Sequence, residues 1–194
     1  MFSGLILVLL LTSAGPAESL LGSKLEEAEQ TDFFKFFNLK ETGAYLASEK
    51  NLVVGFAPDS PTFRELVSVH VTLDTTKTIV GIDLILSRSF IDHKTNGIFA
   101  RDIAKSLLRS AVPQEDQKAI SDLANEIEFP AEGPGQSIIR VSPPPKLPDK
   151  TTAGYLVYMG KSTLFELAMT TWKLRLENRK VNAKDSLMIS ITSK

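Results

Sequence analysis

The 194-residue chain contains no cysteine. This absence excludes disulfide bonds, zinc or iron–sulfur sites built on thiolates, a cysteine nucleophile and a lipid-modified N-terminal cysteine. The fold must therefore be held together by its apolar core. A chain of this length is long enough to bury such a core, in one ordinary domain or at most two small ones.

The chain also lacks an excess of charge of either sign, because 22 basic residues face 23 acidic ones and leave a net charge of −1. Such a balance gives no broad attraction to nucleic acid or to an anionic membrane, so we expect no nucleic-acid partner. Hydrophobic residues make up 43% of the chain, which is the proportion of a globular domain and not of a disordered one.

No apolar run is long enough to cross a membrane, which takes about 20 helical residues. The most apolar stretch, Leu5–Leu11, has the length of the apolar region of a secretory signal peptide. Small residues follow it, and cleavage after Ala17 or after Ala14 would suit signal peptidase, although residues 1–4 carry no Lys or Arg. We therefore expect residues 1–17 to be a signal peptide and the mature protein to be exported to a periplasmic or extracellular space, without a stable membrane span. The alternative is an uncleaved, buried N-terminal strand or helix.

Residues 18–43 form a polar segment with one aromatic cluster. Ser23 and Glu26 have the spacing of a helix capping box, which predicts a short helix through Ala28. The aromatic cluster follows directly and consists of Phe33, Phe34, Phe36 and Phe37.

The aromatic cluster is a candidate ligand- or partner-binding site. At helical spacing Phe33, Phe36 and Phe37 would share one face, with Phe34 to one side. We favour docking of this face onto a sheet, because buried phenylalanine is the common case. The alternative is an exposed aromatic patch that contacts lipid or a partner protein.

Residues 44–194 are predicted to form a single α+β domain that begins with antiparallel strands. Residues 45–47 and 52–56 flank a turn at 49–51, as in a hairpin. The clearest pattern is the alternation of apolar and polar residues over 67–73, which predicts a strand with one buried face. The return strand over 80–87 is expected to point Val80, Ile82, Leu84 and Leu86 inward.

After Asn96 and Gly97 the apolar period changes from two residues to 3.6, which indicates a helix. Its apolar stripe consists of Phe99, Ala100, Ile103, Ala104, Leu107, Leu108 and Ala111. Pro113 ends this helix and suits the first turn of a second one. The second apolar stripe consists of Ala119, Ile120, Leu123, Ala124 and Ile127.

The remainder of the chain is predicted to return to strands. Residues 138–141 and 155–159 have strand patterns, and a Pro-rich connection at 143–148 lies between them. We expect 163–177 to form one long strand bent near Ala168, with a helix over 163–171 as the alternative. Leu187, Ile189 and Ile191 indicate a last strand. The resulting fold class is α+β, a mostly antiparallel sheet of about seven or eight strands with two consecutive helices packed on one face.

Gly160, Lys161 and Ser162 resemble the end of a phosphate-binding P-loop. The full motif needs a glycine five residues before Gly160, whereas Gly154 lies six residues before it. The residues between the two glycines also read as a strand and not as a loop. We therefore interpret this segment as a tight turn between two strands.

The two histidines are the only candidates for general acid–base chemistry or for metal binding through imidazole. His70 lies on the polar face of its predicted strand, and His93 follows Asp92 in a loop. A metal site would need both histidines to converge with a carboxylate such as Asp83 or Asp92, and no ligand spacing supports this. No Gly-x-Ser-x-Gly motif indicates a serine nucleophile. We predict no catalytic residue, metal or cofactor, and keep as the alternative a hydrolase or metal-assisted enzyme that uses His70 or His93.

A second candidate binding surface is a basic stripe on the first long helix. Arg101, Lys105 and Arg109 recur every four residues and so lie on one side of the helix. The stripe could contact an anion or a partner, but an ordinary solvated face explains it better. Taken with the aromatic cluster, the sequence predicts an exported, non-catalytic module that binds a protein partner or an apolar or lipidic ligand.

Overall fold

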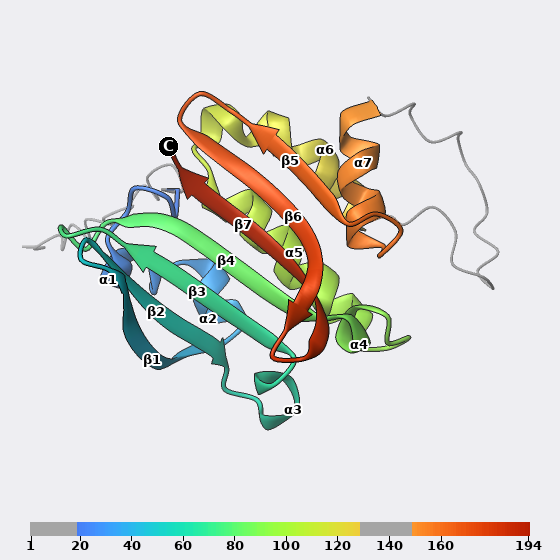
Figure 1. Cartoon of the computed structure of the whole chain (residues 1–194), viewed down its shortest axis with the longest axis horizontal. Helices are drawn as coiled ribbons and strands as arrows, with labels where there is room; N and C mark the ends of the chain where they lie inside the picture. Colours follow the sequence, from blue (N-terminus) through green and yellow to red (C-terminus); the bar gives the residue numbers. More distant parts are fainter. Residues whose placement is uncertain (1–18, 129–148) are drawn as a thin grey trace, which may run out of the picture.

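The computed structural model describes residues 19–128 and 149–194 of the chain. Figure 1 shows a seven-stranded antiparallel sheet whose helices gather on one face. The strand order is β1-β2-β3-β4-β7-β6-β5. The strands are β1 (Leu39–Ser48), β2 (Asn51–Pro58), β3 (Val67–Leu73), β4 (Ile79–Ser87), β5 (Leu164–Ala168), β6 (Trp172–Val181) and β7 (Lys184–Ser193). The predicted fold class is therefore confirmed.

The helices are α1 (Leu25–Ala28), α2 (Asp32–Phe36), α3 (Pro61–Arg64), α4 (Arg88–Ile91), α5 (Gly97–Ala111), α6 (Gln117–Glu128) and α7 (Asp149–Tyr158), with a short 3₁₀ turn, η1 (Gln114–Asp116), before α6. The longer helices α5, α6 and α7 lie behind the sheet in Figure 1. Among residues 19–128 and 149–194, no helix combines the length and apolar character that crossing a membrane requires.

The centre of the sheet joins the two halves of the chain. Strand β7 pairs with β4, so that Ile82, Leu84 and Leu86 lie opposite Ile191, Ile189 and Leu187 in turn. All six side chains are buried against the helical layer. Strand β3 shows the predicted alternation, with Val67, Val69, Val71 and Leu73 buried and the residues between them half-buried. Strand β7 is the predicted last strand, with Leu187, Ile189 and Ile191 buried.

One inward position on β4 differs from the prediction. Thr72 pairs with Gly81 but Leu73 pairs with Ile79, so Val80 is the extra residue of an irregularity in the ladder. Such a bulge leaves its extra residue unpaired and shifts the residues beyond it by one position. Ile79 therefore takes the fully buried place that we expected for Val80, which is only half-buried.

The two predicted amphipathic helices are α5 and α6. Within the expected stripe of α5 every residue except Phe99 is buried, and Ile120, Leu123 and Ala124 of α6 are buried as well. Phe99 is 49% exposed. Its partial exposure places it at the edge of the helical layer, where it contributes to the site described below.

Residues 155–159 are predicted as a strand, and this prediction is wrong because 155–158 belong to α7 and Met159 lies in the turn that follows it. The helix packs so closely on α6 and β5 that a Cβ on Gly154 would lie 2.9 Å from Leu123 Cδ1 and 3.2 Å from Phe165 Cδ1. It ends in a left-handed glycine, Gly160 (φ +73°), whose N–H donates to the carbonyl of Val157 while Lys161 N–H donates to that of Leu156. The Gly160 turn therefore joins a helix to a strand and not two strands.

Residues 163–177 were correctly predicted as extended, but they form two strands and not one. The chain reverses after Ala168, so that β5 and β6 pair as a hairpin with Leu167 opposite Leu174. The turn is closed by Met169 N–H, which donates to the carbonyl of Trp172 (2.9 Å). The alternative of a helix over 163–171 is wrong.

The N-terminal segment is part of the core, because Leu20, Ala28 and Phe33 are completely buried. Helix α1 is capped one residue later than predicted, since the backbone N–H of Lys24 donates to Glu27 Oε2 (3.0 Å). The Ser23 hydroxyl instead donates to the carbonyl of Leu20 (2.9 Å). Strand β1 already begins at Leu39, so the boundary drawn at 43/44 lies within it. The predicted signal peptide, the predicted strand at 138–141 and the predicted Pro-rich connection at 143–148 lie outside the described residues.

Candidate ligand-binding site

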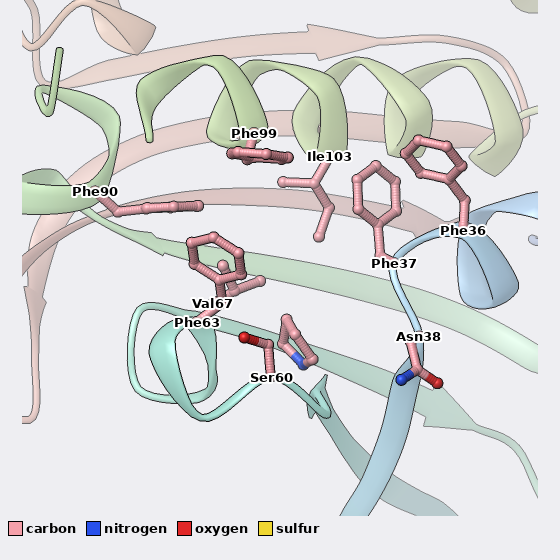
Figure 2. Close-up of a pocket in the computed structure, with 10 residues that line it drawn as sticks. Phe36, Phe37, Asn38, Ser60, Phe63, Val67, Phe90, Phe99 and Ile103 are labelled. Atoms are coloured by element: carbon pink, nitrogen blue, oxygen red, sulfur yellow. The ribbon is translucent and has the colours of Figure 1, made fainter. Parts of the chain in front are cut away.

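An apolar pocket of about 270 Å³, called the aromatic pocket below, opens between the N-terminal half of α5 and one end of the sheet. Figure 2 shows that its side chains converge from α2, α3, α4, α5 and the start of β3. The lining residues are Phe36, Phe37, Asn38, Pro58, Ser60, Phe63, Val67, Phe90, Phe99 and Ile103.

Two groups of aromatic rings form opposite sides of this pocket. In one group the Phe63 ring lies 5.4 Å from that of Phe90 and 5.5 Å from that of Phe99, measured between ring centroids. In the other, the Phe36 and Phe37 centroids are 5.0 Å apart. Figure 2 shows Ile103 of α5 between the two groups. The space between them is therefore enclosed by the flat and edge surfaces of aromatic rings, which present large apolar contact areas.

The predicted aromatic cluster is divided by the end of α2. Phe33 and Phe34 are buried in the core, whereas Phe36 is 76% exposed and Phe37 is half-buried. Phe36 therefore does not share the docked face that we predicted for it. The division occurs because α2 has only five residues and the chain turns at Asn38 (φ +46°) into β1. Asparagine tolerates this left-handed conformation better than most residues.

Among the described residues, the pocket lining holds no charged side chain, and its polar side chains are Asn38 and Ser60. Within the part of the chain that the structure describes, neither of these side chains makes a hydrogen bond. The amide of Asn38 can both donate and accept, as can the Ser60 hydroxyl. The pocket can therefore hold an uncharged apolar group and can offer it one or two hydrogen bonds.

The histidines lie outside this pocket. His70 on β3 is directly opposite Asp83 on β4, on the sheet face away from the helices, and in residues 19–128 and 149–194 it makes no hydrogen bond to a carboxylate. His93 Nδ1 accepts hydrogen bonds from the backbone N–H groups of Thr95 (3.2 Å) and Asn96 (3.1 Å) before α5. The described residues contain no group of three or more His, Cys, Asp or Glu that could hold a metal ion.

The basic stripe also lies outside the pocket. Arg101 and Lys105 are half-buried, and Arg109 is exposed and donates from Nη2 to Asn125 Oδ1 on α6 (3.1 Å). Both Lys105 and Arg109 have further interactions. This pairing agrees with an ordinary helix surface that also connects α5 to α6.

Several of the residues that line the pocket are not evident from the sequence. Phe63 and Phe90 are far apart in the sequence and come from helices of only four residues. Phe99 was assigned to the core stripe and not to a site. The one signal that could have pointed to them is the phenylalanine content, which is 11 residues in 194.

No family model, curated protein sequence or solved structure matches this chain.

Proposed function

We propose that the protein is an exported, non-catalytic binding protein whose aromatic pocket holds a small, uncharged apolar ligand. The observation that carries this proposal is the pocket between the two groups of rings, whose lining contains no titratable side chain in the part of the chain that the structure describes. Acid–base and metal-assisted chemistry need a group of that kind beside the ligand, and the Ser60 hydroxyl would need an adjacent base to act as a nucleophile. The pocket residues can bind and orient a ligand, but they offer no such group for reaction.

The size and lining of the pocket specify the ligand class. Small-molecule sites are usually apolar clefts of roughly 300–1,000 Å³ with a few convergent polar groups, and the pocket, at about 270 Å³, is slightly smaller than that range. A carboxylate-bearing ligand would lose its hydration there without gaining a charged partner. We therefore expect an aromatic or short aliphatic ligand with at most a hydroxyl, a carbonyl or an uncharged aryl amine group near Asn38 and Ser60.

The neutral fluorophore N-phenyl-1-naphthylamine tests the ligand class, because its emission rises on transfer to an apolar site. We expect saturable binding to the full-length mature protein. The Phe36→Ala substitution should raise the dissociation constant about 5- to 10-fold, since an aromatic contact contributes about 1–1.4 kcal/mol. Phe36 is 76% exposed, so its removal should leave the core intact.

The matched control is Leu46→Ala. Leu46 is 75% exposed on β1 but does not line the pocket. It should leave the dissociation constant unchanged. Equal losses of affinity in the two variants would mean that the probe binds exposed apolar surface in general, and an unchanged affinity in Phe36→Ala would place the probe elsewhere.

The export part of the proposal is supported by the signal-peptide pattern of residues 1–17. Mass spectrometry of exported material should therefore find a mature N-terminus at Glu18 or, after the alternative cleavage, at Gly15. An intact Met1 on the purified protein would overturn this part of the proposal and leave ligand binding untouched.

A further inference from the structure

A second pocket lies on the other side of α4 and has a different chemical character. Its volume is about 580 Å³, and it is formed by α4, the Gly160 turn after α7 and the hairpin of β6 and β7. Figure 1 shows α4 beside the closed end of that hairpin. Phe90 of α4 lines the aromatic pocket, whereas Arg88 and Asp92 line this one.

Arg88 is the inner cation of this charged pocket. Its side chain is only 15% exposed. Nη1 donates to the carbonyl of Tyr158 (2.6 Å), and Nη2 donates to Asp92 Oδ1 (2.8 Å). A guanidinium carries five N–H donors in a rigid plane, so within the described residues three donors have no acceptor. Donors on a nearly buried, fixed cation gain most from an oxyanion that reaches them.

The lack of a side chain at Gly160 leaves room for the Arg88 guanidinium. A Cβ at this position would lie 2.8 Å from Arg88 Nη2 and 3.2 Å from Cζ, so a side chain would displace the cation. The left-handed backbone of Gly160 (φ +73°) independently favours glycine. The turn that resembles a P-loop in sequence therefore shapes this pocket through its missing side chain.

The charges around Arg88 leave the pocket positive. Within residues 19–128 and 149–194, its other ionisable lining residues are Arg179 and Lys180 of β6 and Asp185 of β7, so three cations face two carboxylates. Lys180 makes no ion pair among the residues that the structure describes, and Arg179 Nη1 is 4.0 Å from Glu177 Oε2. Asp92, the partner of Arg88, is 62% exposed and can accept from water when an anion engages the guanidinium.

We propose that this pocket binds the oxyanion group, carboxylate or phosphate, of a small ligand. Arg88 anchors the anion, and Arg179 and Lys180 attract it at the mouth. The site is separate from the aromatic pocket and does not depend on the function proposed for it.

The test uses inorganic phosphate and acetate as separate probes, titrated into the mature protein at constant ionic strength. Backbone amide shifts are followed by NMR, with Gly160 as the reporter. We expect saturable shifts at Gly160 for at least one probe, and comparison of the two dissociation constants distinguishes a phosphate site from a carboxylate site. Shifts that grow linearly with both probes would overturn the proposal.

A double variant, Arg179→Ala with Lys180→Ala, should raise the dissociation constant at least 5-fold. Both side chains are exposed, so the fold should persist. The control is Lys50→Ala with Lys77→Ala, which removes two exposed lysines from hairpin turns at the opposite end of the sheet. Equal affinity in the two double variants would show nonspecific attraction to the net charge, and the proposal would fail.

Discussion

The Trp172→Ala substitution is expected to lower the free energy of unfolding by about 3–5 kcal/mol, as for other large aromatic side chains removed from a core. Trp172 begins β6 and is only 1% exposed. Its indole Nε1–H donates to Asp116 Oδ2 (2.7 Å) in the turn between α5 and α6. The side chain therefore ties the far side of the sheet to the helical layer both by packing and by a charge-assisted hydrogen bond.

Asp116→Ala separates these two contributions. It keeps the ring in place but leaves a buried N–H without its acceptor, and such a loss costs about 1–3 kcal/mol. Urea unfolding followed by far-UV circular dichroism measures every variant, because Trp172 is the only tryptophan and cannot serve as the reporter. Tyr45→Ala on the exposed edge strand is the control and should change the free energy by less than about 0.5 kcal/mol.

Two outcomes would contradict this account. If Trp172→Ala lowered the free energy of unfolding no more than the Tyr45→Ala control does, the indole would not be part of the core. If Asp116→Ala left the free energy of unfolding unchanged while Trp172→Ala lowered it strongly, packing alone would hold the sheet to the helices. The two substitutions are expected to be non-additive when combined, because both remove the same hydrogen bond.

The strands that could be predicted from the sequence are those with one face against the helices and one face away from them. Val67, Val69 and Val71 on β3 alternate with polar residues because the two faces meet different surroundings. The same argument located α5, whose apolar residues recur with the helical period. In both cases the local pattern and the tertiary environment select the same element.

Helix α7 was missed because its local preference and its packing disagree. Tyr155, Val157 and Tyr158 favour strands intrinsically, and the helix has no clear apolar stripe over its ten residues. Val157 and Tyr158 are nevertheless buried, and Gly154 allows close contact with α6. That contact depends on residues more than 30 positions away, so a local reading of the sequence could not reveal it.

The aromatic pocket could be predicted only in part. The sequence identified the cluster from Phe33 to Phe37, yet the residues that face it across the pocket, Phe63 and Phe90, follow other strands. Their approach depends on the order β2-β3-β4 in the sheet and on the crossing of α5 above it. The charged pocket was equally hidden, because Arg88 and Arg179 are 91 positions apart and meet only through the pairing of β4 with β7.

Gly97→Ala should be the most disruptive single-methyl change in the helical layer. Gly97 is the first residue of α5 and is buried, and its N–H donates to the carbonyl of His93 (2.8 Å). A Cβ there would lie 2.5 Å from the carbonyl oxygen of Ile91. A backbone carbonyl cannot rotate away from the clash as a side chain would, so we expect the free energy of unfolding to fall by about 1–3 kcal/mol. This fall is expected even though alanine is more favourable than glycine in a helix by about 1 kcal/mol.

The clash at Gly97 should also change the shape of both pockets, because the end of α4 must move to relieve it. Phe90 on that helix lines the aromatic pocket, and Arg88 lines the charged one. We therefore expect Gly97→Ala to weaken N-phenyl-1-naphthylamine binding and phosphate binding together, beside its loss of stability in urea. Ile98→Ala, at the neighbouring position that is 50% exposed, should change none of these quantities. If Gly97→Ala lowered the free energy of unfolding but left both dissociation constants unchanged, α5 would have moved while α4 stayed in place. The shape of the two pockets would then be set by the sheet and not by the α4–α5 turn.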